Sequence, residues 1–514
     1  MSPTRRLVLH DVLAQHARAR GAELAVGDGD VLLTWSELAE RVDRCAGALR
    51  AEGVGRGDRV LWLGQNSFRV LELLLGCSRL GALFCAANWR QRAGELAFVV
   101  DDLTPAVLFT QAEEVGDEVA AGLSVADHRA RTIRHDADGA EGYEAWCASA
   151  PAREIDDLTE PGDALLCTYT AAFDGRPNAA MLPHRAIVAQ GLLMGPWMGV
   201  SARSRYLAAG PLFHVGVWME GFATFLAGGA NVFVRRSDGE ALCRAIADFG
   251  CTSGYVVGPM VDAVVAANEG GRFDLSSMRG RRGHPAYDAW VGVDDSPWGR
   301  RPGGYGQTET MGMSTFALLS SADELGTHGR PSPLVQVRVV DPDGADVPVG
   351  ETGEILVRGE TVMCGYWNRP ELNAVRSRGG WHHTNDLGCY EVDGSFSFVA
   401  PKGRMLKSGA ENIYPEEVEQ ALRTHPAVAE VAVIGVPDEV WVQSVKAIVV
   451  RQAAATVTEA ELIEHCRARI AGYKKPRTVV FVEALPRAGW QVDYAALDAA
   501  HGGGSYPGGN NRPV

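Results

Sequence analysis

Two short segments carry polar residues that could bind a phosphorylated ligand. Thr308 and Glu309 follow a glycine-rich stretch in GGYGQTETMG, residues 303–312, and Asp386 lies in HTNDLG, residues 383–388. A threonine hydroxyl can donate a charge-assisted hydrogen bond to a phosphate. A glutamate can give an oxygen ligand to a hard cation such as Mg²⁺. A polar loop between a strand and a helix contains the same residue types, so neither segment identifies a function by itself.

The elements that position these residues alternate along the first 400 positions. Residues 58–64 and 106–111 predict strands and residues 68–81 predict a helix, an order typical of α/β layers around a parallel sheet. Residues 336–365 alternate around two turn signals, which predicts antiparallel hairpins. From about residue 400 we expect a small α/β unit, with helices beginning near Pro415 and Thr458 and strands at 428–436 and 444–450.

Composition excludes several classes of function. The net charge is −15 and the pI is about 5.4, which argues against a nucleic-acid-binding surface. No run of 18 or more apolar residues is present, so we expect no membrane span. The first 20 residues do not resemble a secretory signal. The ten cysteines show no metal-binding spacing and indicate reduced thiols in a cytoplasmic protein.

Five segments, taken together and in order, carry a family resemblance. They are PLFHVG (211–216), GGYGQTETMG (303–312), GEILVRGETVMCGYWNRPE (353–371), HTNDLG (383–388) and SGAENIYPEEVE (408–419). The set resembles the adenylate-forming superfamily in its acyl-CoA synthetase branch, over residues 10–498. The resemblance implies an α/β fold with a large N-terminal AMP- and acyl-binding domain, residues 1–400, built of two α/β subdomains and a distorted β-barrel. A hinge (401–404), a small mobile α+β domain that delivers CoA (405–498) and a disordered tail (499–514) would follow.

The resemblance also implies a reaction in two halves. ATP and a carboxylate first give an acyl-AMP and pyrophosphate. The C-terminal domain then rotates, and the thiol of coenzyme A displaces AMP. ATP with Mg²⁺, AMP and coenzyme A are therefore the implied cofactors.

Site residues follow from the matched motifs. AMP or acyl-adenylate would contact the segments GHP and GYGQTE and the ribose acceptor, which are Gly283, His284, Pro285, Gly304, Tyr305, Gly306, Gln307, Thr308, Glu309 and Asp386. The acyl pocket would contain His214, Trp218, Gly221, Tyr255, Val257 and Gly258. CoA would contact Ser408, Gly409, Ala410, Lys474 and Lys475. A structural role for His214 and a solvated basic turn at Lys474 and Lys475 are the simpler alternatives. Asn385 replaces a family glycine, and asparagine tolerates the left-handed backbone.

The phosphate loop departs from the family pattern. Hydroxyl and glycine positions are replaced by Ala171, Ala172 and Phe173, and Asp174 adds a carboxylate where a triphosphate would lie. A phosphate loop needs small residues, backbone N–H groups and hydroxyls. The family's lysine in this loop is Asn178 here.

Two further positions depart near the C-terminal domain. In an ungapped match, the family's nucleotide-contacting arginine is Pro401 and its hinge aspartate is Arg404; a gapped match would instead read Gly403 and Arg404 as the family's Gly-Arg pair. The lysine that bridges carboxylate and α-phosphate during adenylation is replaced by Gln491, or by the neighbouring Trp490. A neutral amide cannot offset the charge that develops as two anions meet, which is usually the largest catalytic contribution.

All of these changed positions belong to the adenylation half-reaction in the family pattern. Three hypotheses remain open. The first is a ligase-type enzyme that keeps only thioesterification and takes acyl-AMP from a separate adenylating ligase, with ATP and Mg²⁺ in doubt. This pattern resembles the non-adenylating ligases of platensimycin and platencin biosynthesis, which implies antibiotic biosynthesis and a diterpenoid acid. The second is a complete ATP-dependent ligase with unusual motifs, and the third is a catalytically silent protein that binds acyl-adenylate. No nucleic-acid or membrane partner is expected.

Lysine usage sharpens the first hypothesis. The chain has five lysines, all at or beyond the hinge: Lys402, Lys407, Lys446, Lys474 and Lys475. Genomic drift would replace lysine by arginine, yet Asn178 and Gln491 are neutral. The missing lysines therefore indicate a discarded half-reaction.

Overall fold

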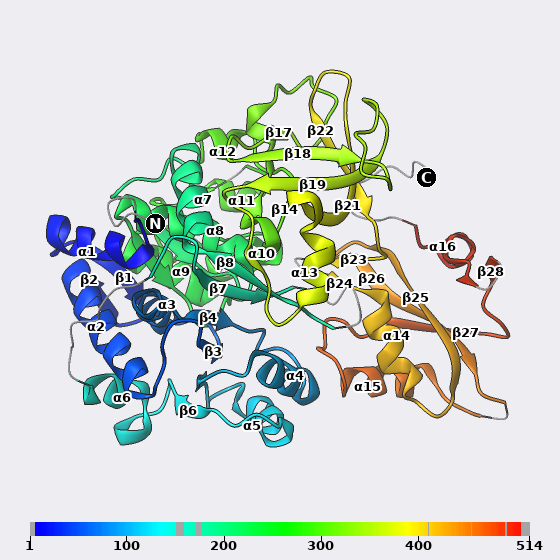
Figure 1. The fold of residues 1–514 in the computed structure, drawn as a ribbon, viewed down its shortest axis with the longest axis horizontal. Helices are drawn as coiled ribbons and strands as arrows, with labels where there is room; N and C mark the ends of the chain where they lie inside the picture. Colours follow the sequence, from blue (N-terminus) through cyan, green and yellow to red (C-terminus); the bar gives the residue numbers. More distant parts are fainter. Residues whose placement is uncertain are drawn as a thin grey trace.

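The computed structural model describes residues 6–150, 159–170, 176–280, 282–409, 411–453, 455–488 and 491–504. Figure 1 shows a large body, coloured blue to yellow, and a smaller orange and red body beside it. The expected α/β protein with a large N-terminal and a small C-terminal domain is therefore confirmed. Within the described residues, no helix combines the length and the apolar character that a membrane crossing needs.

A seven-stranded, mostly parallel sheet forms the first layer of the large domain. Its order is β20-β8-β7-β4-β3-β5-β6, with β3 (Arg59–Leu63), β4 (Leu83–Ala86), β5 (Val107–Thr110), β6 (Arg131–Arg134), β7 (Ala164–Tyr169), β8 (Ala179–Pro183) and β20 (Gly365–Tyr366). The helices of this part of the chain are α1 (Leu9–Arg20), α2 (Trp35–Ala51), α3 (Phe68–Leu80), α4 (Ala93–Leu103), α5 (Gly116–Val125) and α6 (Tyr143–Ser149), with the 3₁₀ turn η2 (Gly139–Glu141).

The predicted strand–helix–strand unit of residues 58–111 is confirmed as β3, α3 and β5. Helix α3 begins after Ser67, whose hydroxyl accepts from the Arg69 N–H, and N-terminal serine caps of this kind stabilise helices. The helix ends at Gly81 with φ of 67°, the left-handed backbone that glycine adopts at low cost.

A second sheet lies beside the first. Its order is β11-β9-β10-β1-β2, with β1 (Leu24–Asp28), β2 (Val31–Thr34), β9 (Arg205–Ala208), β10 (Ala230–Phe233) and β11 (Ser253–Gly254). The helices of this region are α7 (His184–Trp197), α8 (Val215–Ala227), α9 (Gly239–Phe249), α10 (Pro259–Ala267) and α11 (Pro285–Asp288). One apolar core, which includes Leu38, Trp62 and Phe222, joins the two sheets.

The predicted antiparallel hairpins form a four-stranded sheet. Its strands are β18 (Val335–Val340), β19 (Gly353–Gly359), β21 (His382–Tyr390) and β22 (Phe396–Pro401), in that order. Where a distorted barrel was expected, these strands form an open row within the described residues. Short pairs and turns complete the domain: β12 (Arg279–Gly280) with β13 (Gly292–Val293), β14 (Gly306–Gln307) with β15 (Gly312–Met313), β16 (Thr315–Phe316) with β17 (Arg330–Pro331), α12 (Pro297–Arg300), α13 (Pro370–Arg376), η3 (Thr308–Thr310), η4 (Ala317–Leu319) and η5 (Arg378–Gly380).

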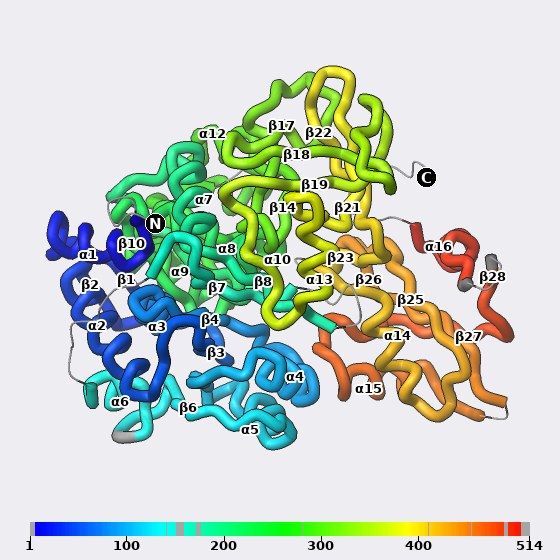
Figure 2. The backbone as a smooth tube through the Cα atoms, in the orientation of Figure 1, coloured from blue at the N-terminus to red at the C-terminus, as the bar shows by residue number. Residues whose placement is uncertain are grey.

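The small domain begins where the chain leaves one sheet and enters another. Figure 2 traces this passage from β22 to β23 (Leu406–Ser408). The remaining elements are β24 (Glu411–Ile413), α14 (Pro415–Arg423), β25 (Val428–Asp438), β26 (Val442–Arg451), α15 (Glu459–Arg467), β27 (Thr478–Val482), β28 (Arg487–Ala488), β29 (Gln491–Val492) and α16 (Tyr494–His501). The predicted helices and strands of this unit are confirmed.

The end of the small domain differs from the expected residue 498. Helix α16 continues to His501 because the Asp493 side chain caps its first turn and Gly502, with φ of 80°, ends it. Residues 505–514 of the expected disordered tail lie outside the described residues.

Candidate functional site

A cavity of about 620 Å³ lies between the two domains. This volume is within the range of about 300–1,000 Å³ that ligand pockets usually have. Its wall joins residues that are more than 200 positions apart in the chain. The predicted site residues that line it are His214, Tyr255, Gly304, Tyr305, Gly306, Gln307, Thr308, Glu309, Asp386, Pro401 and Lys474.

A buried hydrogen-bond network surrounds Asp386 at one end of the cavity. The Tyr305 hydroxyl donates to Asp386 Oδ2 over 2.8 Å, and Gln307 Nε2 donates to the same oxygen over 3.1 Å. The Tyr305 ring packs face to face on Phe398, with ring centroids 5.5 Å apart. Both Tyr305 and Asp386 are therefore fixed before any ligand binds.

Asn385 adopts the backbone conformation that the sequence required of it. Its φ angle is 61°, in the left-handed region that asparagine tolerates better than most residues. Asn385 therefore has the left-handed conformation that was predicted for it, and Asp386 lines the cavity.

Glu309 is buried beside the cavity, with 6% of its surface exposed. The Tyr366 hydroxyl donates to its Oε1 over 2.7 Å. Burial raises the pKa of Glu309, while the Tyr366 hydrogen bond and the Arg376 charge act in the opposite direction. Thr308, the predicted phosphate donor, precedes it at the cavity wall.

Glu309 is the predicted Mg²⁺ ligand at the cavity wall. Among the described residues, no group of three or more His, Cys, Asp and Glu side chains could hold a metal ion. Mg²⁺ is commonly held by one or two carboxylates together with substrate phosphates. Glu309 fits that arrangement, in which the nucleotide would supply the remaining oxygens.

The GHP segment does not line the cavity. Gly283 and Pro285 are exposed, and His284 lies 3.6 Å from Asp262 of helix α10. The contact of Gly283, His284 and Pro285 with adenine stays a prediction, and the cavity lining does not include these residues. The physical reason is that Asp288 accepts from the Gly283 N–H and ties the segment to α11, at the surface.

The predicted acyl-pocket residues divide into three groups. His214 and Tyr255 line the 620 Å³ cavity. Val257 and Gly258 are exposed outside it, contrary to the prediction. Trp218 and Gly221 are buried behind the cavity wall, on helix α8.

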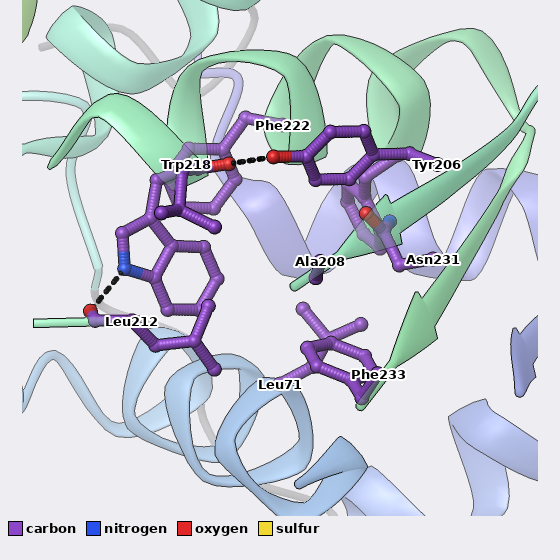
Figure 3. Close-up of a pocket in the computed structure, with 11 residues that line it drawn as sticks. Leu71, Tyr206, Ala208, Leu212, Trp218, Phe222, Asn231 and Phe233 are labelled. Carbon is purple, nitrogen blue, oxygen red and sulfur yellow. Dashed lines mark hydrogen bonds between the residues drawn. The ribbon is translucent and has the colours of Figure 1, made fainter. Parts of the chain in front are cut away.

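Aromatic packing explains why Trp218 and Gly221 do not line the cavity. Figure 3 shows the rings of Trp218 and Phe222 beside Tyr206. The Trp218 and Phe222 rings stack 5.0 Å apart, and Trp218 Nε1 donates to the Leu212 carbonyl over 2.7 Å. The space that remains among these residues is about 10 Å³, too little for an acyl group.

The C-terminal domain contributes a second wall that sequence analysis only partly anticipated. Lys407, Glu411 and Asn412, on β23 and β24, line the cavity. Glu411 Oε2 lies 3.1 Å from His214 Nε2, across the domain boundary. The motif SGAENIYP contained Glu411 and Asn412, but their roles depend on a domain arrangement that the motif does not encode.

The predicted CoA-binding lysines have different surroundings. Lys474 is buried, and its ammonium lies 2.7 Å from Glu95 of α4 and also contacts Glu417 of α14. Burial opposes its charge, yet Tyr473, Glu417 and Glu95 together raise the pKa of Lys474. Lys474 therefore forms an interdomain ion pair at the cavity wall. Its contact with CoA stays a prediction, and Lys475 is only half-buried. Ser408 and Gly409 lie at the end of β23, and Ala410 is outside the described residues.

Family models match both domains. The AMP-binding enzyme model matches residues 13–367 and the AMP-binding enzyme C-terminal domain model matches residues 417–489. The chain belongs to the AMP-binding enzyme family. It is an enzyme of the acyl-CoA ligase branch, and it is 36% identical over 489 residues to a feruloyl-CoA synthase of Amycolatopsis sp, covering 92% of this chain and 95% of the relative.

Two solved structures resemble this AMP-binding enzyme to different degrees. The first is a double mutant of o-succinylbenzoate CoA synthetase from Bacillus subtilis bound with its product analogue OSB-NCoA. Its TM-score is 0.78 at 26% identity, and the match covers 95% of this chain and 97% of the synthetase. The second is ATP-bound MatB from Rhodopseudomonas palustris, with a TM-score of 0.63, 25% identity and 96% and 99% covered.

The positions of this AMP-binding enzyme that were predicted to depart from the family pattern lie as follows. Asn178 is buried, and its Oδ1 accepts from Arg369 Nε over 3.1 Å. Pro401 pairs in register with Asp386 and lines the cavity. Gln491 lies in β29, paired with β28. The substituted loop positions Ala171, Ala172, Phe173 and Asp174, like Trp490, lie outside the described residues.

Arg404, at the predicted hinge, is attached to the small domain. Its guanidinium lies 3.3 Å from the centroid of the Tyr494 ring and donates to the Val433 carbonyl over 2.6 Å. A positively charged side chain over an aromatic face is attracted by the ring. Arg404 therefore moves with the small domain.

Replacing Asp386 by asparagine should stabilise the fold at neutral pH. Burial raises the pKa of Asp386 to about 7, from an ordinary value of 3.8. Between about pH 4 and 7 the folded wild type therefore holds a proton that the unfolded chain has lost, and its free energy of unfolding falls as pH rises. Asp386→Asn has no carboxyl group to titrate at this position. The difference between the unfolding free energies of the variant and the wild type, measured with urea, should therefore increase from about pH 4 to about pH 7.

The exposed Asp343 supplies the matched control. Asp343→Asn should leave the pH dependence of the unfolding free energy unchanged. If the difference in unfolding free energy between Asp386→Asn and wild type stayed constant from pH 4 to 8, the raised pKa assigned to Asp386 would be wrong. The same Asp386 variant should bind AMP more weakly above pH 7, because a neutral amide is a poorer acceptor for ribose hydroxyls.

Proposed function

We propose that this enzyme catalyses only the thioester-forming half of the acyl-CoA ligase reaction. A preformed acyl-AMP and coenzyme A would give acyl-CoA and AMP. The C–S bond forms, the bond between the acyl carbon and the phosphate oxygen breaks, AMP leaves with the electron pair, and the thiol proton passes to solvent. A separate ligase would supply the acyl-AMP.

The orientation of the C-terminal domain is the observation that carries this proposal. Its β23–β24 face meets the cavity, with Glu411 against His214. The β28–β29 hairpin, which contains Gln491, lies beside α16 on the other side of the small domain in Figure 1. In this arrangement the segment after the hinge lines the cavity, as the proposed thioester formation requires.

The chemistry of the substituted positions points in the same direction. Asn178 and Gln491 replace the two lysines that adenylation uses in the family, and Pro401 replaces an arginine beside Asp386. Without these cations a triphosphate and a carboxylate would meet with little compensating charge. ATP and Mg²⁺ are therefore proposed to be dispensable, whereas AMP as acyl-AMP and CoA are required.

Residue roles follow from this assignment. Residues 1–400 would bind the acyl-AMP, with Tyr305, Thr308 and Asp386 around the nucleotide and His214 and Tyr255 near the acyl carbonyl. Residues 401–404 would act as the hinge, and residues 405–498 would deliver CoA past Gly409. Antibiotic biosynthesis in the cytoplasm, with a diterpenoid acid, is the setting that the pattern of lost residues suggests.

Two assays test the proposed function. Feruloyl-AMP, o-succinylbenzoyl-AMP or a diterpenoid acyl-AMP, given with CoA, should yield the acyl-CoA and AMP from at least one donor. ATP with the corresponding free acids should release no pyrophosphate. The retained Glu309 beside Tyr366 favours a complete ATP-dependent ligase as the second candidate, and stoichiometric pyrophosphate release would establish it. Absence of transfer from every donor, with AMP binding intact, would instead indicate a silent acyl-adenylate-binding protein.

A further inference from the structure

One arginine lies in the part of the cavity wall that the large domain provides. Among the described residues of this domain that line the cavity, Arg376 is the only lysine or arginine. It is the last residue of helix α13. A guanidinium keeps its positive charge throughout the pH range of a folded protein, and it can present two N–H donors to one phosphate. Arg376 therefore has the chemistry that a bound phosphate ester needs.

The surrounding elements hold Arg376 in place at the cavity wall. Arg376 Nη1 donates to the His383 carbonyl over 3.2 Å, three residues before Asp386 on β21. One helical turn earlier, the Asn373 side chain accepts from the Tyr366 N–H and donates to the Tyr366 carbonyl, which fixes α13 against β20. Only 8% of the Arg376 surface is exposed, yet the residue lines the cavity. The guanidinium is therefore preorganised on rigid elements.

The charge of Arg376 acts at the nucleotide end of the cavity. Burial raises the pKa of Glu309 and of Asp386, and the charge of Arg376 acts on both carboxyl groups in the opposite direction. Both groups belong to the predicted nucleotide contacts. Opposite charges attract more strongly in such a buried site than in water, because the effective dielectric constant is lower. A phosphate bound beside these residues would therefore gain more from Arg376 than from an arginine at the surface.

The proposed reaction begins with the binding of a preformed acyl-AMP. The phosphate of acyl-AMP carries one negative charge, which one guanidinium can match through two parallel hydrogen bonds. Arg376 belongs to the large domain, so a rotation of the small domain about residues 401–404 would leave its position unchanged. A cation that stays in place can hold the adenylate both before and during transfer to CoA.

We propose that Arg376 is a phosphate-binding residue of the large domain, whose guanidinium contacts the phosphate of acyl-AMP and of the AMP that leaves. The inference rests on the proposed function, which brings a preformed acyl-AMP to this cavity. Arg376 would supply the positive charge that the family match predicts at Asn178 and Pro401, where this chain has neutral residues.

Equilibrium binding of AMP and of adenosine, measured by titration calorimetry, tests this role. Arg376→Gln should weaken AMP binding by about 10- to 100-fold, the usual effect of losing one charged hydrogen-bonding partner. Adenosine has no phosphate, so its dissociation constant should hardly change. Arg376→Lys should bind AMP with intermediate affinity, because the ammonium keeps the charge but lacks the planar fork of donors.

The matched control is Arg378→Gln, which removes an exposed arginine two residues further along the chain. Arg378 donates to the Val375 carbonyl, and its variant should bind AMP as tightly as wild type. Equal AMP affinity in Arg376→Gln and wild type would overturn the inference. An equal loss of AMP and adenosine binding would also overturn it, because Arg376 would then only support the fold of the site. Absence of acyl transfer by a wild-type enzyme that binds AMP would instead overturn the proposed function.

Discussion

Gly409→Leu should reduce acyl transfer to CoA by about 10²-fold or more. Gly409 lies between β23 and β24 with φ of 59°, and its N–H donates to the Trp441 carbonyl over 2.7 Å. A Cβ at this position would lie 3.1 Å from the Trp441 ring, so a larger side chain must displace the ring or the hairpin. Displacement of reacting groups by about 1 Å can cost about 10²-fold in rate. Single-turnover transfer to CoA and equilibrium binding of acyl-AMP measure the two effects separately.

The control for Gly409→Leu must reproduce the cost of an L-residue in left-handed backbone. Gly344 has φ of 84° and open space around it in a turn of the large domain. Gly344→Leu should lose stability comparable to that of Gly409→Leu, roughly 1–2 kcal/mol, and retain transfer. If Gly409→Leu weakened acyl-AMP binding as much as transfer, the assignment of this turn to the thiol path would be wrong.

Lys474→Met should release the small domain from its present position. The change leaves Glu95 and Glu417 facing each other without the cation between them. Removal of one partner from a buried ion pair typically costs about 3–5 kcal/mol. Opening the interface returns both carboxylates to water, so the ratio of docked to undocked enzyme should fall by on the order of 100-fold. Small-angle scattering should show a larger radius of gyration, and trypsin should cleave faster after Lys402, which is half-exposed.

A triple variant with neutral side chains shows whether the interface opens because of uncompensated charge or because of lost packing. Glu95→Gln, Glu417→Gln and Lys474→Met together remove the uncompensated charges. The radius of gyration and the trypsin cleavage rate should return most of the way to the wild-type values. An unchanged cleavage rate in the single variant would show that other contacts, such as the hydrogen bond from Asn88 to Tyr473 at 3.2 Å, hold the domain.

The local sequence pattern was sufficient to predict individual helices and strands, and also much of the cavity wall that would bind a nucleotide. The segment that forms β3, α3 and β5 is determined by apolar periodicity and by Ser67 and Gly81 at the two helix ends, each of which acts on the helical turn next to it. The motif around Thr308 and Glu309 reaches the cavity as expected, because a short glycine-rich turn between paired strands leaves few alternative paths. Asn385 could be assigned a left-handed conformation for the same local reason.

Predictions that depended on packing between distant segments were less successful. Trp218 and Gly221 were expected in the acyl pocket, but stacking of Trp218 on Phe222 fills that space. The GHP segment was expected beside adenine and lies at the surface, tied to Asp288. Neither side-chain stacking nor the path of a loop over the surface is encoded in a short motif.

The sequence by itself determined the family and the two-domain order, and it carries the prediction that two functional positions lack the charge of a lysine. Residue types at Asn178 and Gln491 are sufficient for that, because charge is a property of the side chain alone. Only the tertiary structure decided how the remaining charges are used: Lys474 joins the domains through Glu95 and Glu417, while Lys407 faces the cavity beside Asn412. The two lysines differ in their neighbours: Asn412 lies five residues from Lys407 on the adjacent strand, whereas Glu95 lies 379 residues from Lys474 and meets it only across the domain interface.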